Sequence, residues 1–164
     1  MSAAGMNASS DVVHVRSRFA DADVNPNDIV RFPDGIPGYE TVRDFVLLDV
    51  PDQAPLKVLH AVNAPEPCFL VVDPKSVLPT YRYVLSASDR RRLGAGDDVP
   101  EATGADGVEP GRSALLWLAI VSVDETGTVA VNLRAPIVIN PERMTGRQVM
   151  PNACVYPLRH VIEQ

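Results

Sequence analysis

The chain has 164 residues, a formal net charge of −6 and a hydrophobic fraction of 46%. This length suffices for one domain whose core needs no metal or disulfide support. The negative charge disfavours direct binding to nucleic acid, because the phosphates would be repelled. The fifteen prolines and ten glycines exclude an all-helical bundle and predict a mainly β protein with many short strands.

The start of the chain carries no recognisable targeting signal. Residues 1–10 are small and polar, which predicts a flexible leader before one folded domain at 11–164. The most apolar stretch, ALLWLAIVSV at 114–123, is about half as long as a membrane span requires. Cys68 and Cys154 lack CxxC spacing. We therefore expect a cytoplasmic protein in a reducing environment, without a membrane anchor.

The first half of the chain reads as a series of strands. Alternation predicts a strand in VHVRSRF at 13–19, followed by the turn Asn25-Pro26-Asn27. Further strands are expected at 45–50, 58–62, 68–73 and 81–86, with proline in the loops between them. In SASDRRRL, Ser86 stands three residues before Asp89, which predicts one short capped helix that ends by Gly94.

An acidic segment interrupts the strands. Residues 94–111, GAGDDVPEATGADGVEPG, contain no lysine or arginine and few apolar side chains, which predicts a mobile loop within the domain. Its carboxylates do not follow an EF-hand pattern, but such charges would speed encounter with a basic partner. The residues expected to steer a partner in this way are Asp97, Asp98, Glu101, Asp106 and Glu109.

Strands resume after this loop. ALLWLAIVSV is followed by the turn DETG, then by TVAVNL, PIVIN and a last apolar stretch from 148 to about 158. Nine or ten short strands with one short helix predict a small antiparallel β-barrel or sandwich. The pattern does not distinguish between these two.

The stretch RFPDGIPGYE at 31–40 is unusually restricted. Pro33-Asp34-Gly35 and Pro37-Gly38 each predict a tight turn, so the two together form a rigid corner. One interpretation is a simple connection between strands. The other is that the corner holds Ile36 and Tyr39 out toward another molecule.

Motifs for catalysis are missing from the sequence. His14, His60 and His160 have no metal-ligand spacing, neither cysteine has a nucleophile context, and no GxSxG or complete GxGxxG motif occurs. We expect no catalytic residue, metal or cofactor. Two alternatives stay open: a small-barrel enzyme or ligand binder that uses His60 with nearby carboxylates, and an OB-like RNA binder, which acidity and few aromatic residues disfavour.

Four stretches, in this order, resemble the flagellar assembly factor FliW family. They are NPNDIVRFPDGIPGYETVRDFVLL (25–48), FLVVDPKSVLPTYRYVLS (69–86), VAVNLRAPIVIN (129–140) and RQVM (147–150). The resemblance implies a cytoplasmic, non-enzymatic, barrel-like protein that binds flagellin. When free of flagellin, and expected to be a monomer, it binds and allosterically antagonises the translational repressor CsrA, which relieves repression of flagellin synthesis.

The resemblance also implies roles for single residues. Contact with a partner, or support of the contact surface, is expected from Ile36, Tyr39, Tyr81, Asn132 and Asn140. Structural roles in the motifs are expected from Phe32, Gly35, Pro37, Gly38, Phe69, Pro74, Leu133 and Pro136. The loop at 94–111 is longer than the segment expected in the family at this point.

Overall fold

The computed structural model describes residues 13–17, 21–62, 64, 66–95, 115–150 and 156–162. Within these ranges the chain is mainly β, as its composition predicts. In chain order the elements are β1 (Val13–Arg16), β2 (Asp21–Val24), the 3-10 turn η1 (Pro26–Asp28), β3 (Ile29–Arg31), β4 (Asp44–Asp49), β5 (Lys57–Ala61), β6 (Cys68–Val72), α2 (Pro74–Val77), α3 (Ala87–Arg92), β7 (Leu116–Val123), β8 (Val129–Val131), β9 (Ile137–Asn140), β10 (Thr145–Gln148) and β11 (His160–Val161).

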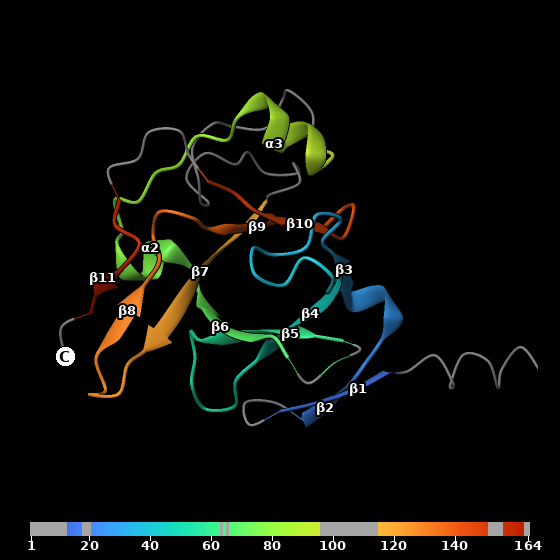
Figure 1. Cartoon of the computed structure of the whole chain (residues 1–164), viewed down its shortest axis with the longest axis horizontal. Helices are drawn as coiled ribbons and strands as arrows, with labels where there is room; N and C mark the ends of the chain where they lie inside the picture. Colours follow the sequence, from blue (N-terminus) through green and yellow to red (C-terminus); the bar gives the residue numbers. More distant parts are fainter. Residues whose placement is uncertain are drawn as a thin grey trace, which may run out of the picture.

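Strand β7 closes the large sheet into a barrel. It pairs with β6 along one edge, and its first half pairs with β9 while its last residues pair with β8. The order β7-β6-β5-β4-β3-β10-β9 therefore returns to β7 and forms a closed ring of seven strands (Figure 1). Closure removes sheet edges that would otherwise invite pairing with other chains. The barrel, and not the sandwich, is the correct alternative.

The inside of the barrel is packed with apolar side chains. Phe45 lies opposite Ala61, and both belong to the buried inner cluster. Because successive side chains of a strand face opposite sides of the sheet, the next pair, Val46 and His60, faces outward. The hairpin of β1 and β2 covers this outer face, where Val24 packs with Val46.

The corner at 31–40 closes one mouth of the barrel. Ile36 is 1% exposed and belongs to the inner cluster, and the link between β3 and β4 bends into the ring (Figure 1). Gly35 makes this bend with a φ of 68°, and the Tyr39 amide donates a hydrogen bond to the Ile36 carbonyl at 2.7 Å. The corner is therefore a plug with an apolar tip, which explains its rigidity.

The predicted strand at 81–86 is wrong, although its alternation is real. Tyr81, Tyr83 and Leu85 are buried while Arg82 and Val84 are exposed, yet the segment belongs to no strand. A backbone amide of this segment bonds to a side chain and not to a neighbouring strand: the Arg82 amide donates a hydrogen bond to the Tyr156 hydroxyl at 2.8 Å. The alternation of buried and exposed side chains at 81–86 therefore arises from an extended backbone that packs on the barrel, and not from pairing in a sheet.

The helices differ in number from the prediction. The capped helix at 86–93 is confirmed as α3, since the Ser86 hydroxyl accepts a hydrogen bond from the Asp89 amide at 3.0 Å. A second short helix, α2, has no counterpart in the prediction. It begins after Asp73, whose carboxylate accepts from the Lys75 amide, and has Pro74 in its first turn, which is the pattern of a helix start.

Some predictions concern residues outside the described ranges. These are the leader at 1–10, residues 96–111 of the acidic loop with its five steering carboxylates, and Cys154. Across the described part of the chain, no helix has the length and apolar character needed to cross a membrane.

Candidate functional site

Three of the five residues expected to contact a partner are buried. Ile36, Tyr81 and Asn140 are 1%, 0% and 3% exposed, which favours support of the contact surface over direct contact for them. Tyr81 donates its hydroxyl hydrogen bond to the Leu133 carbonyl at 2.9 Å, and the Asn140 amide donates to the Leu93 carbonyl at 2.8 Å. These polar side chains satisfy buried backbone groups and support the surface from beneath.

Asn132 has a turn-forming role. Its side-chain oxygen accepts hydrogen bonds from the backbone amides of Arg134 and Ala135 at 3.1 and 3.0 Å. Such contacts stabilise a local turn, here the one between β8 and β9. Asn132 therefore shapes the NLRAP segment, and its half-buried side chain is already engaged.

Among the five, Tyr39 alone is exposed, with 42% of its surface accessible. Its ring meets the ring of Phe69 edge to face, with centroids 5.7 Å apart and an interplanar angle of 80°. The neighbouring ring limits the orientations of this exposed tyrosine. It sits at the barrel mouth that the corner closes.

The residues expected in structural roles mostly lie inside. Phe32 and Leu133 are fully buried, Phe69 is half-buried, and Gly35, Pro74 and Pro136 are buried. Pro37 and Gly38 are exposed in the turn that follows Ile36, where Gly38 has a φ of 92°. These environments fit the roles that turn chemistry and packing assign to them.

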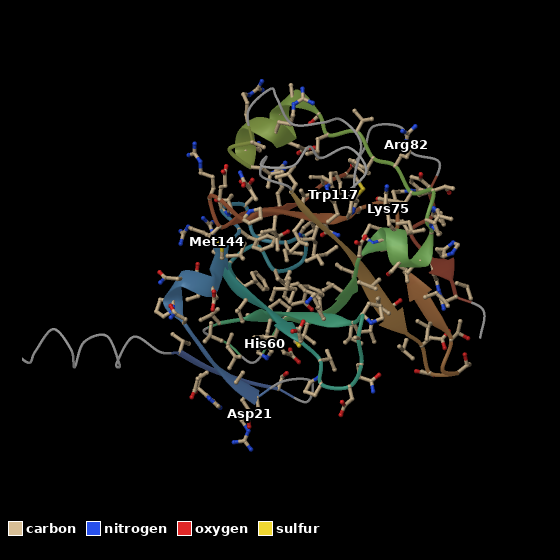
Figure 2. All side chains as sticks on the ribbon, turned by 180° about the vertical axis from the view of Figure 1, so that it is seen from behind. Asp21, His60, Lys75, Arg82, Trp117 and Met144 are labelled. Atoms are coloured by element: carbon tan, nitrogen blue, oxygen red, sulfur yellow. The ribbon has the colours of Figure 1, made fainter. Side chains whose placement is uncertain are left out.

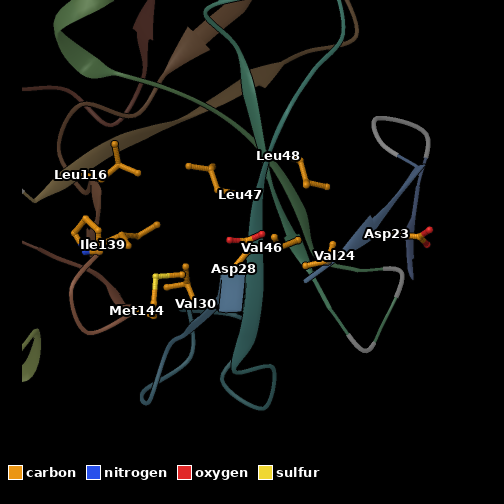
Figure 3. Close-up of a pocket in the computed structure, with 11 residues that line it drawn as sticks. Asp23, Val24, Asp28, Val30, Val46, Leu47, Leu48, Leu116, Ile139 and Met144 are labelled. Carbon is orange, nitrogen blue, oxygen red and sulfur yellow. The ribbon is translucent and has the colours of Figure 1, made fainter. Parts of the chain in front are cut away.

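A first hollow lies at the opposite mouth, where β4 ends. It has a volume of about 250 Å³, and Figure 3 shows aliphatic side chains from β4, β7 and β9 around it. Its apolar walls include Leu47, Leu116 and Ile139, and two carboxylates, Asp23 and Asp28, stand at its side. The hollow is open because β3 pairs with β4 only as far as Val46, which leaves the last residues of β4 without a β3 partner.

A second, larger hollow adjoins the first through Leu116. It measures about 710 Å³ and is lined by β7 and by the β4–β5 loop, with Trp117 in its wall. Leu116 lines both hollows and is 37% exposed. We call the two together the mouth groove, defined by the residues that line them.

The rim of the mouth groove is acidic. Among the described residues that line it, the only basic one is Lys57, which is paired with a carboxylate of the rim. An apolar floor within a negative rim favours a partner with apolar side chains and positive charges. The carboxylates that line it are Asp23, Asp28, Asp49, Asp52 and Asp73.

Sequence reasoning missed this groove. Its carboxylates stand in turns and at strand ends, such as PDQAP and DIVRF, where single acidic residues are common. The aspartates at the end of β4 and directly after β6 were the available signal.

A network of charged side chains holds α3 to the plugging corner. Arg147 on β10 donates to Asp89 at 2.8 Å and also pairs with Asp34 of the corner. Arg92 on α3 reaches the same Asp34 carboxylate at 3.2 Å. Arg147 and Asp89 are mostly buried, whereas Asp34 and Arg92 are half exposed. The corner, the helix and the barrel wall are thus tied at one point.

The β1–β2 hairpin beside the groove carries a histidine that contacts two aspartates. His14 contacts both Asp21 and Asp23 at 2.7 Å, and the hydrogen bond to Asp23 is the main cause that raises the pKa of His14 above its ordinary value of 6.5. Because the folded pKa lies above the unfolded one, the pairing stabilises the hairpin fully below the unfolded value. This stabilisation is lost as the pH rises through the folded pKa.

We therefore expect the hairpin to open more readily at high pH. Amide hydrogen exchange in β1 and β2, corrected for its intrinsic pH dependence, should show greater protection at about pH 5 than at about pH 8. His14→Gln is the control and should remove the difference. An equal pH effect in both proteins would contradict this role for His14.

The alternative site at His60 is not supported as first proposed. His60 is 1% exposed, and its Nδ1 lies 2.6 Å from the Ala61 carbonyl oxygen, while Nε2 has no hydrogen-bond partner among the described residues. Neither ring nitrogen therefore meets a carboxylate there. In the described part of the chain, no group of three or more histidine, cysteine, aspartate or glutamate side chains is arranged to hold a metal ion.

Comparison with known proteins gives one consistent family. The family described as "FliW protein" matches residues 14–162. The flagellar assembly factor FliW of Geotalea uraniireducens is 32% identical over 145 residues, covering 88% of this chain and 80% of the relative. That of Geobacillus kaustophilus is 33% identical over 140 residues, covering 85% and 88%.

A solved structure agrees with the sequence matches. The crystal structure of a flagellar assembly factor FliW superposes with a TM-score of 0.75 at 30% identity and covers 90% of this chain and 95% of its own. The structural similarity therefore extends over nearly the whole barrel and is not limited to one motif.

Proposed function

The chain belongs to the FliW family of flagellar assembly factors, and on this premise we propose that it binds flagellin and, when free of flagellin, the translational repressor CsrA. Binding to CsrA away from its RNA surface would antagonise repression allosterically and restore flagellin synthesis. In this scheme the protein works in the cytoplasm, as a monomer when free, and through binding alone.

The mouth groove is the observation that carries the proposal. A segment of flagellin that presents apolar side chains along one face of a helix fits an apolar floor such as that formed by Leu116 and Ile139, in the manner of a helix bound in a groove. Tyr39, at the opposite mouth, is the second proposed contact. The two surfaces lie at different ends of the barrel.

The charge of the protein supports the second partner. A net charge of −6 favours association with a basic RNA-binding protein, because opposite charges raise the rate of encounter. We assign this steering to Asp97, Asp98, Glu101, Asp106 and Glu109. Buried Ile36, Tyr81 and Asn140 are proposed to support the contact surfaces and not to touch a partner.

Size exclusion of mixed proteins tests the function directly. The purified chain is expected to co-elute with flagellin of its own organism and, in a separate mixture, with CsrA at micromolar concentrations. Flagellin added to the CsrA mixture should release CsrA. If neither partner co-elutes, the proposed function is wrong. If flagellin and CsrA bind at the same time, the proposed partners are correct but the proposed exchange between them is wrong.

A substitution at Leu116 tests the groove. We expect Leu116→Ser to weaken flagellin binding by about tenfold or more, because it removes apolar contact area at the centre of the groove. Val123→Ser is the matched control, since Val123 is also an exposed residue of β7 but lies at the other end of the strand, outside the groove. Isothermal titration calorimetry measures the affinity of both variants for flagellin. If Leu116→Ser and Val123→Ser bind flagellin equally well, flagellin does not bind in the groove.

A further inference from the structure

His60 and Cys68 stand side by side on the outer face of the barrel. They are paired across β5 and β6. The neighbouring pair is joined by the hydrogen bond from the Ala61 amide to the Pro67 carbonyl at 3.0 Å, so His60 and Cys68 form a pair without backbone hydrogen bonds. Side chains lie closest in such pairs of an antiparallel sheet. In Figure 2, His60 lies between this sheet and the hairpin that carries Asp21.

The contacts of His60 fix which nitrogen carries the proton. Its Nδ1 lies 2.6 Å from the carbonyl oxygen of Ala61, and a carbonyl can only accept, so Nδ1 must donate. The neutral ring then has its lone pair on Nε2. That atom is buried and has no hydrogen-bond partner in the described part of the chain. A buried acceptor without a donor is uncommon in native proteins, and here it belongs to the residue that pairs with Cys68 across the two strands.

The side chain of Cys68 is the second part of this arrangement. Cys68 is partly exposed and retains its thiol. Its sulfur lies 3.7 Å from the hydroxyl of Ser17, the residue after the end of β1. The thiol therefore sits at the junction between the barrel wall and the covering hairpin.

We propose that Cys68 is a site of modification by hydroperoxides and other electrophiles, with Nε2 of His60 as the base that receives its proton. The thiolate attacks one peroxide oxygen, the S–O bond forms and the O–O bond breaks. Sulfur is oxidised by two electrons to a sulfenic acid, and the peroxide is reduced. The leaving alkoxide or hydroxide takes the proton from His60 and departs as alcohol or water.

The modification has a structural consequence for the mouth groove. An added oxygen on Cys68 competes with Ser17 for the space at the end of β1. The hairpin, of which β1 is the first strand, supplies Asp23 and Val24 to the wall of the first hollow. Oxidation of Cys68 therefore loosens the hairpin and changes one wall of the groove.

The rate of alkylation tests the role of His60. Cys154→Ser serves as the reference protein, so that Cys68 is the only cysteine that reacts with iodoacetamide at neutral pH, followed by mass spectrometry. Adding His60→Gln is expected to slow the reaction by about tenfold or more, because glutamine can keep the contact to Ala61 but supplies no base. His160→Gln is the matched control and should leave the rate unchanged.

Two outcomes would overturn the proposal. Equal rates in the reference and His60→Gln proteins would exclude His60 as the base. Reaction of Cys68 only in urea would show that the folded protein shields the thiol. If His60→Gln fails to fold, hydrogen peroxide on the reference protein gives the second measurement. A sulfenic acid trapped by dimedone at Cys68 supports the site, and its absence after prolonged treatment contradicts it.

Discussion

Gly35→Ala should lower the free energy of unfolding by about 3 kcal/mol or more, because two separate costs add. Gly35 has a φ of 68°, where a side chain is strained. An added Cβ would also lie 2.6 Å from the Cα and 2.7 Å from the carbonyl oxygen of Glu40. These are backbone atoms and cannot swing away, so the whole corner must shift and Ile36 would leave its place in the barrel.

Gly38→Ala separates the two costs. Gly38 also has a positive φ, of 92°, but nothing lies within 4 Å of an added Cβ. We expect only the conformational cost of about 1–2 kcal/mol. Urea unfolding of both variants and the parent measures the difference. If both variants lost the same free energy of unfolding, the backbone at Glu40 would have moved to accommodate the new methyl group at no cost. The corner would then be less rigid than its geometry indicates.

Phe32→Ala should cost about 3–5 kcal/mol, because it empties a fully buried site in the barrel. The ring of Phe32 packs against Phe45 with centroids 5.1 Å apart. It also lies against Gly146 on β10, where an added Cβ would stand 2.5 Å from the ring. Gly146→Ala alone should therefore cost about 1–3 kcal/mol through overpacking.

The double variant carries the sharper test. Removing the ring of Phe32 opens the space in which the methyl group introduced by Gly146→Ala would otherwise clash, so the combined loss should be smaller than the sum of the two single losses. Thermal and urea unfolding of the four proteins gives the coupling. Additive losses would mean that Phe32 and Gly146 do not share the space, which would contradict the packing described for β10.

Local sequence patterns predict which turns and strands form in this fold better than they predict which side chains point into the barrel. Turn chemistry at Pro33, Gly35 and Gly38 is enough to predict a rigid corner, but nothing local says whether Ile36 points into a barrel or out of it. That depends on closure of a ring by strands far apart in the sequence. For the same reason the alternation at 81–86 predicts a strand that does not form, since packing alone produces the same period.

The candidate site is less predictable than the fold. The mouth groove draws single residues from distant segments, such as Asp23, Asp49 and Leu116, and no one segment shows an unusual pattern. Asn132 and Asn140 stand out as motif residues, yet their hydrogen bonds show that they hold turns and buried carbonyls. These two motif residues thus meet needs of the backbone, whereas the groove depends on how the strands pair.

The pairing of β3 with β10 sets the order in which the molecule can become complete during its synthesis. Arg31 meets Thr145 across the last seam of the ring, so most of the chain must leave the ribosome before the seam can form. Until β9 has also been made, Leu116 has no Ile139 opposite it, and the groove has only one wall. A ribosome-bound or truncated chain without β9 and β10 thus offers no complete groove, and any partner that needs both walls selects finished molecules only.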